Sequence, residues 1–213
     1  MAKKMGYDGL ELACWGDHFD VVKGAESVEY CDEKKKLLAD NGLQVWAISN
    51  HLAGQLVCDP NDARADGFGP ADAAGDPEKL RAWAIETMKL TAKAAKNLGI
   101  SVVNGFTGSS IWGAFYSFPP WTDDMVADGY KDFAAKWIPI LDVFVENDVK
   151  FGLEVHPTEI AYDTYTALAA VEAVDGHPAF GINFDPSHLV WQMVDSADFV
   201  RSLGDRIFHV HMK

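Results

Sequence analysis

Three runs in the last third of the chain alternate apolar with polar residues, and the polar positions include side chains that bind metal ions. The runs read FGLEVHP, FGINFD and IFHVHM. Because alternate residues of a strand share one face, Glu154, Asp185 and His211 fall on the polar face of three consecutive strands. Burying two carboxylates and an imidazole without partners is costly, and a divalent cation bound to all three removes that cost.

We therefore predict a metal site whose ligands are Glu154, Asp185 and His211, one from each strand. His209 shares the polar face but lies one layer deeper, so it is the weaker choice. Mixed oxygen and nitrogen ligands suit Mn²⁺, Mg²⁺, Co²⁺ or Zn²⁺, and ligand type alone does not choose among them. The alternative is a set of internal ion pairs and hydrogen bonds without metal.

Five further residues fall at the same ends of the expected strands and are candidates for contacting a substrate. His156 ends the first of the three runs, His188 follows Asp185 in DPSH, and His51 ends an earlier strand. Trp15 ends the first strand and offers a flat apolar wall, and Lys213 follows His211. Each also has a purely structural interpretation, such as a loop hydrogen bond, core packing or a solvated charge.

The elements that carry these residues alternate strand with helix along the whole chain. Apolar runs predict strands at Gly9–Trp15, Leu43–His51, Ile100–Thr107, Lys150–His156, Ala179–Asp185 and Arg206–Met212. Helical periodicity and capping residues predict helices at Val28–Asn41, Pro77–Leu98, Asp123–Asn147, Tyr162–Val174 and Ser196–Leu203.

This alternation predicts a parallel α/β sheet covered by helices. Two architectures fit it: an open doubly wound sheet and a closed (β/α)₈ TIM barrel. No G-x-G-x-x-G follows the first strand, which weakens the doubly wound dinucleotide-binding alternative. A typical barrel has about 250 residues. The expected fold is therefore one incomplete barrel domain over residues 1–213, with about six βα units.

Composition excludes several function classes. The chain has 213 residues, 48% of them hydrophobic, with 18 Lys and Arg against 32 Asp and Glu, a net charge of −14. Such an acidic protein repels phosphate backbones, so we expect no nucleic-acid partner. We also expect no membrane association, because no apolar run has membrane length. Three cysteines without a C-x-x-C motif predict free thiols and a cytoplasmic protein.

Four motifs in chain order, GYDGLEL, LEVHPTE, NFDPSHL and HVHMK, resemble the xylose isomerase-like TIM barrels. That superfamily covers sugar phosphate isomerases and epimerases, ketose 3-epimerases, inosose dehydratases and endonuclease IV. The resemblance places Glu154, Asp185 and His211 on the family's metal-ligand positions. It also implies that His188 contacts substrate and that Glu154 is one of two acid/base carboxylates.

The resemblance implies a metal-dependent isomerase or epimerase of a small sugar or sugar phosphate, acting by proton abstraction next to a carbonyl through an enediolate. An inosose-type dehydratase is the alternative. A truncated, non-catalytic barrel is another, because the family's second acid/base Glu stands on an eighth strand that would follow Lys213. An endonuclease IV-like nuclease fits poorly with seven His and a charge of −14.

Two features bear on association with other chains. A barrel that lacks neighbouring strands exposes two strand edges, which pair readily with another chain, so we expect a homo-oligomer or poor solubility. The loop over residues 108–122, GSSIWGAFYSFPPWT, is rich in aromatic side chains. We interpret it as a lid or a subunit contact.

Overall fold

The computed structural model, which describes residues 1–113 and 116–213, contains a six-stranded parallel sheet. The strands pair in chain order, β1 to β6. Their bounds are β1 Gly9–Ala13, β2 Gln44–Ser49, β3 Val102–Gly105, β4 Lys150–Glu154, β5 Phe180–Phe184 and β6 Ile207–Val210. Every strand is shorter than its apolar run predicts, because the last residues of each run leave the hydrogen-bonded ladder and enter the following loop or helix.

Eight α-helices lie within the described residues and cover one face of the sheet. Their bounds are α1 Val21–Glu26, α2 Val28–Asp40, α3 His51–Gln55, α4 Pro77–Leu98, α5 Asp123–Glu146, α6 Thr164–Ala173, α7 Pro186–Trp191 and α8 Ser196–Leu203. Short 3₁₀ turns are η1 Ala2–Met5, η2 Asp66–Phe68, η3 Ala71–Ala73 and η4 Gly204–Arg206. The sequence did not predict α1, α3 and α7, each of which has only five or six residues.

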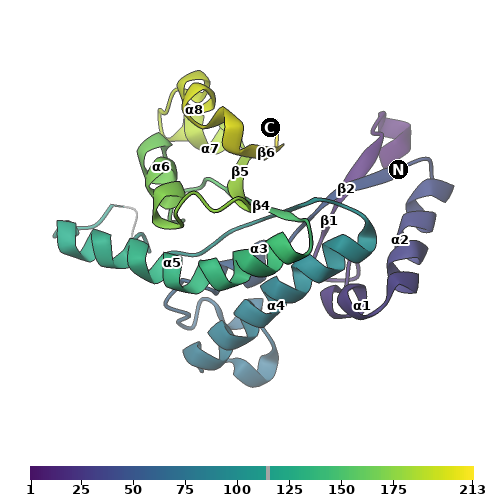
Figure 1. The fold of residues 1–213 in the computed structure, drawn as a ribbon, viewed down its shortest axis with the longest axis horizontal. Coiled ribbons are helices and arrows are strands. Elements are labelled where there is room, and N and C mark those ends of the chain that lie inside the picture. The colour runs from purple at the N-terminus through teal and green to yellow at the C-terminus, as the bar shows by residue number, and fades with distance from the viewer. Residues whose placement is uncertain (114–115) are drawn as a thin grey trace.

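The helices follow the curve of the sheet as a continuous outer layer. Helix α1 packs on α4, α4 on α5, α5 on α6 and α6 on α8. In Figure 1, α1 and α2 lie beside β1 and β2, whereas α6, α7 and α8 group around β5 and β6. Parallel strands in chain order with helices on the outside form a half-barrel, which confirms the predicted incomplete TIM barrel.

The helix predicted at Pro77–Leu98 forms with these bounds as α4, because its ends carry strong capping signals. The Asp76 side chain accepts a hydrogen bond from the Lys79 backbone N–H, and Pro77 occupies the first helical position. Gly99 ends the helix in the left-handed conformation with φ of 77°. Between these ends a stripe that includes Leu80 and Met88 is buried.

The apolar faces of the strands pack against the helices, as the alternation predicts. The ring of Phe151 lies 4.6 Å from that of Trp137 on α5 and 5.8 Å from that of Phe144. The Phe180 ring lies 5.7 Å from the Phe133 ring. Each of these fully buried rings contributes about 1.5–3 kcal/mol through removal of its surface from water, so this layer holds the sheet and the helices together.

The concave face of the sheet carries the polar side chains. Gly152 lies at its centre, where a Cβ atom would be 2.9 Å from Asn104 Oδ1 and 3.2 Å from the backbone N of Asn183. Glycine at this position therefore leaves room for two amide side chains. Glu11 on β1 reaches His209 and His211 at the other sheet edge, at 3.1 Å in each case, so the two edge regions meet across the interior.

Three other expectations concern the chain outside the sheet. Cys14, Cys31 and Cys58 are free thiols, as predicted. Within the described residues, no helix has the length and apolar character needed to cross a membrane. The interpretation of the loop over 108–122 as a lid or contact includes residues 114 and 115, which lie outside the described residues.

Candidate metal and substrate site

Glu154 is the centre of a cluster of imidazoles at the carboxyl end of the sheet. It is the last residue of β4 and only 4% exposed. Its carboxylate oxygens lie 2.9 Å from His51 Nε2, 3.1 Å from His188 Nε2 and 3.2 Å from His211 Nδ1. Residues far apart in the sequence therefore meet at one carboxylate, at the end of the barrel where (β/α)₈ enzymes place their active sites.

Asp185 is held with one carboxylate oxygen facing this cluster. It follows β5 directly and caps α7, where its Oδ1 accepts hydrogen bonds from the Ser187 N–H (3.0 Å) and the Ser187 hydroxyl (2.6 Å). Its Oδ2 is buried and faces the cluster. Two cationic or potentially cationic groups face Oδ2: Lys213 Nζ at 2.5 Å and His188 Nε2 at 3.4 Å.

Lys213 also approaches Glu154, with Nζ 3.5 Å from Oε1. Its ammonium therefore lies between the two carboxylates, where a single positive charge compensates both. A position that favours positive charge in this way is also favourable for a metal cation. The Lys213 side chain is 57% exposed, so it is able to move away without disturbing the core.

His211 lies between two carboxylates. Its Nδ1 is 3.2 Å from Glu154 Oε2, and its Nε2 is 3.1 Å from Glu11 Oε2. Hydrogen bonds to Glu11 and Glu154 raise the pKa of His211 to about 9. Glu11 also accepts a hydrogen bond from Asn104 Nδ2 at 2.7 Å, so the carboxylate that orients His211 is itself fixed.

The pKa of Glu154 is set by opposing effects. Burial alone raises it, but hydrogen bonds from His211 and His51, together with their positive charge, outweigh burial and hold the pKa below its ordinary value. Glu154 is therefore ionised at neutral pH. An ionised, buried carboxylate is suited both to binding a cation and to accepting a proton.

The donor atoms present fit a divalent cation. Two groups of three possible ligands have atoms that all lie within 4.8 Å of one another: Glu154 with Asp185 and His188, and Glu11 with His209 and His211. The predicted set of Glu154, Asp185 and His211 is neither of these groups, because the imidazole grouped with Glu154 and Asp185 is that of His188. Buried carboxylate oxygens beside imidazole nitrogens are the donors that such ions prefer.

The other predicted substrate-contacting residues lie around this cluster. His51 is the first residue of α3, and its ring is 6.3 Å from that of Trp15, which is 40% exposed. The His156 ring is 4.3 Å from the His188 ring. His156 Nδ1 donates a hydrogen bond to its neighbour's carbonyl, Pro157 O, at 2.7 Å. All of the proposed substrate residues thus lie at one end of the sheet, and His156 contacts the cluster through the ring of His188.

Several polar residues of this site were not predicted as site residues. Asn183 donates from Nδ2 to Glu154 Oε2 at 3.2 Å. Asn104 supports Glu11 from the adjoining part of the interior. The Oδ1 atoms of both asparagines are buried without a hydrogen-bond partner in the described residues. The alternation of FGINFD already placed Asn183 on the polar face, and this pattern could have identified it as a site residue.

An incomplete (β/α)₈ barrel with carboxylates and imidazoles at the carboxyl ends of its strands defines a broad class of barrel proteins. Over its whole length, residues 1–213, the chain matches the family model described as xylose isomerase-like TIM barrel, and the chain belongs to that family. The resemblance noted from the four sequence motifs is therefore confirmed.

Relatives include proteins of known sequence and of solved structure. The chain is 33% identical, over 228 residues, to the uncharacterized protein YfiH of Bacillus subtilis strain 168, covering 100% of this chain and 66% of that protein. The fold is similar to that of the probable 3-DHS dehydratase AsbF from Bacillus anthracis, which is involved in petrobactin synthesis. The TM-score is 0.67 at 22% identity, over 100% of this chain and 65% of that one.

A second solved structure with a similar fold is the 3-keto-D-glucoside 4-epimerase YcjR from E. coli. The TM-score is 0.68 at 16% identity, over 98% of this chain and 70% of that one. At these sequence identities, the two structural similarities establish the fold alone. The chain spans about two thirds of the length of YfiH and AsbF.

Proposed function

We propose that this chain provides the metal-binding and proton-transferring part of a sugar isomerase or epimerase. The observation that carries the proposal is the convergence on buried Glu154 of Asp185 and three imidazoles at the carboxyl ends of the strands. Glu154, Asp185 and His211 would hold the ion, which is Mn²⁺, Mg²⁺, Co²⁺ or Zn²⁺. The fold's likeness to a 3-keto-D-glucoside 4-epimerase supports a sugar or polyol substrate.

The chain's own residues supply a proton-transfer route. Glu154 accepts the proton from the carbon next to a carbonyl, which leaves an enediolate, and then returns it. Return of the proton by Glu154 to the neighbouring carbon gives an isomer. An epimer forms when a second acid on the opposite face protonates the same carbon, a role that the family resemblance gives to a Glu on an eighth strand. When bound, a divalent cation supplies polarisation of the carbonyl and stabilises the negative charge that develops on its oxygen.

The surrounding side chains position the sugar. His188 and His51 present ring nitrogens within 3.1 Å of Glu154 and are placed to hold hydroxyl groups next to the reacting carbon. Trp15 provides the apolar wall beside His51, and Lys213 provides a mobile positive charge. His156 borders the same space through its contact with His188.

A dehydratase is the second candidate, and it uses the same first step. Removal of a proton by Glu154 followed by loss of the β-hydroxyl gives an unsaturated product and water. The fold's likeness to a probable 3-DHS dehydratase favours keeping this candidate. The two reactions differ in the pose of the substrate relative to Glu154.

The experiment that tests the proposal is deuterium wash-in. The chain is loaded in turn with each of the four ions and incubated in D₂O with ketoses and 3-keto-glycosides, and recovered sugars are analysed by NMR. We expect deuterium at a carbon next to the carbonyl. We also expect Glu154→Gln to lower the rate by at least about 100-fold, while circular dichroism shows a retained fold.

The matched control is Glu146→Gln, because Glu146 is exposed at the end of α5, and this variant should exchange at the wild-type rate. A dehydrated product in place of deuterated sugar selects the second candidate. If the chain catalyses neither reaction with each of the four ions in turn, the chain is the non-catalytic barrel and the proposal is wrong.

A further inference from the structure

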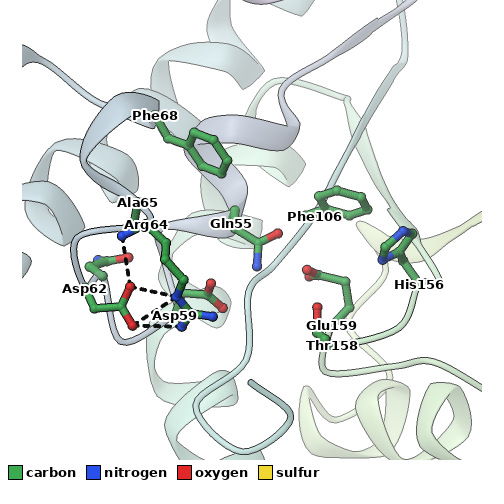
Figure 2. Close-up of a pocket in the computed structure, with 11 residues that line it drawn as sticks. Gln55, Asp59, Asp62, Arg64, Ala65, Phe68, Phe106, His156, Thr158 and Glu159 are labelled. Carbon is green, nitrogen blue, oxygen red and sulfur yellow. Dashed lines mark hydrogen bonds and ion pairs between the residues drawn. The ribbon is translucent and has the colours of Figure 1, made fainter. Parts of the chain in front are cut away.

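A cavity of about 230 Å³ lies next to the candidate site, between the loop that follows α3 and the loop that follows β4. We call it the side pocket. Its volume is roughly that of eight water molecules in the liquid, which is enough for one ring-sized polar group. Figure 2 shows Asp62 and Arg64 at one end of it and Phe106 and His156 at the other.

The side pocket shares a wall with the candidate site. The Phe106 ring lies 5.2 Å from the His156 ring and 4.6 Å from the His51 ring. His51 in turn lies 2.9 Å from Glu154. One aromatic ring therefore separates the side pocket from the imidazole on the proposed base, and a ligand of two joined rings is long enough to occupy both places.

The polar wall of the side pocket consists of acceptors held in fixed positions. Glu159 is 1% exposed, and its Oε2 accepts hydrogen bonds from the backbone N–H groups of Thr107 (2.9 Å) and Gly108 (2.8 Å). The backbone N–H of Ser109 donates to Asp59 Oδ1 at 2.9 Å, so backbone donors hold both of these carboxyl groups in place. The Gln55 side chain also lines the side pocket, and Figure 2 shows its amide between the carboxyl groups of Glu159 and Asp59.

Asn61 adds an acceptor that has no partner. It also lines the side pocket and is 2% exposed. Its Nδ2 donates to Leu56 O at 2.9 Å and Pro77 O at 3.3 Å, whereas its Oδ1 is buried without a hydrogen-bond partner in the described residues. A buried acceptor without a donor is costly, and a ligand hydroxyl that donates to it removes that cost.

The charge of the side pocket argues against a phosphate. Asp59, Asp62 and Glu159 line it with carboxyl groups, and the one guanidinium, that of Arg64, is already bound by Asp62 at 2.8 Å. A phosphate dianion would meet the carboxylate of Asp59 and the Asp62–Arg64 pair, without a free cation among the lining residues to offset its charge. Hydroxyl groups, which donate to carboxylate and amide oxygens, meet no such penalty. The exposed ring of Phe68 offers an apolar face for the ring carbons.

From these contacts we infer that the side pocket binds an uncharged, hydroxyl-rich ring, the second sugar or polyol unit of a substrate whose reacting unit lies at Glu154. The link to a reacting unit rests on the proposed function, whereas binding in the side pocket does not. The substrate is then a glycoside-like molecule of two units and not a sugar phosphate.

The test measures binding to the full chain by calorimetry and by saturation-transfer NMR. The probes are cellobiose, maltose and trehalose, which differ in linkage, and D-glucose 6-phosphate as the charged counterpart. We expect at least one disaccharide to bind about tenfold or more tightly than the phosphate. Phe68→Ala should weaken that binding about three- to tenfold through loss of the aromatic face.

Two comparisons keep the outcome clear. Tyr165→Ala removes an exposed aromatic ring from α6, outside the side pocket, and should leave disaccharide binding unchanged. Asp59→Asn removes one negative charge from the side pocket. It should therefore reduce the ratio of disaccharide affinity to D-glucose 6-phosphate affinity. Equal affinity for phosphate and disaccharides, no disaccharide binding, or equal effects of Phe68→Ala and Tyr165→Ala would overturn the inference.

Deuterium wash-in performed on the same samples separates this inference from the proposed function. Disaccharide binding that depends on Phe68, without any proton exchange, supports the inference about the side pocket and contradicts the proposed function. Proton exchange on a monosaccharide without disaccharide binding supports the proposed function and contradicts the inference about the side pocket.

Discussion

Two buried glutamates five residues apart show how neighbours decide the chemistry of the same side chain. Glu154 has imidazoles around it, and their hydrogen bonds hold its pKa below the ordinary value despite burial. For Glu159 burial is the largest effect and raises the pKa to about 8, and the charge of Asp59 acts in the same direction. One carboxyl group is therefore ionised and the other largely protonated at neutral pH.

The raised pKa of Glu159 predicts a pH dependence of stability. Between the ordinary pKa of 4.5 and about 8, the folded state keeps a proton that the unfolded state releases. Stability therefore falls as the pH rises through this window and levels off above it, by up to about 1.4 kcal/mol per pH unit. Glu159→Gln has no proton to lose and should remove this part of the slope.

Urea unfolding of wild type and Glu159→Gln at pH 5.5, 6.5 and 7.5 measures the effect as a difference in slope. Glu146→Gln, at an exposed position, should keep the wild-type slope. Wild-type and Glu159→Gln curves that run parallel across this range would show that Glu159 is ionised in the folded chain.

At the level of the elements, periodicity predicted most of what positions the site. The two-residue alternation of FGLEVHP and FGINFD assigned the polar face correctly, because Phe151 and Phe180 pack on α5 while Glu154 lies in the interior. In IFHVHM it was correct for His209 and His211 but not for Phe208, because a register shift in β6 places the Phe208 ring over Gly181. The caps of α4 fixed its bounds. The parallel order of six strands followed from strand–helix alternation and is confirmed.

What sequence did not predict depends on contacts between distant segments. Helices α1, α3 and α7 are too short to show a period. The side pocket joins the loop after α3 to the loop after β4, and its residues, such as Asp59 and Glu159, belong to no common motif. Glu11 meets His211 only because the sheet curves enough to bring β1 and the end of β6 together.

The absence of a side chain at Gly152 gives a test of that packed interior. A methyl group there would meet Asn104 Oδ1 at 2.9 Å and backbone N of Asn183 at 3.2 Å, so one of these neighbours must move. We expect Gly152→Ala to lower the free energy of unfolding by about 1–3 kcal/mol, as overpacking does. Gly67→Ala is the control, because its added Cβ meets nothing within 4 Å. Equal stability of the two variants would contradict this packing.

For the whole molecule, the open edges of the half-barrel are the dominant feature. Within the described residues, β1 pairs only with β2 and β6 only with β5. Unpaired parallel edges associate readily with another chain, and the homo-oligomer stays a prediction on this basis. Light scattering coupled to size-exclusion chromatography should give a mass above 23.4 kDa. A sharp, stable monomer peak would contradict it.

Three other predictions at this scale stay open to test. They are the single domain over residues 1–213, the cytoplasmic location and the lack of a nucleic-acid partner. The last follows from the net charge of −14, and a DNA-binding titration at low salt, where electrostatic attraction is strongest, is its most demanding test.

The central claim is that Glu154, Asp185 and an imidazole bind one dication, and Mn²⁺ binding followed by electron paramagnetic resonance tests it most directly. We predict one Mn²⁺ per chain, with ¹⁴N modulation from a bound imidazole that His211→Gln removes. Asp185→Asn should weaken binding, whereas Glu146→Gln should not. No stoichiometric binding, or binding that both Glu154→Gln and Asp185→Asn leave unchanged, would contradict the account.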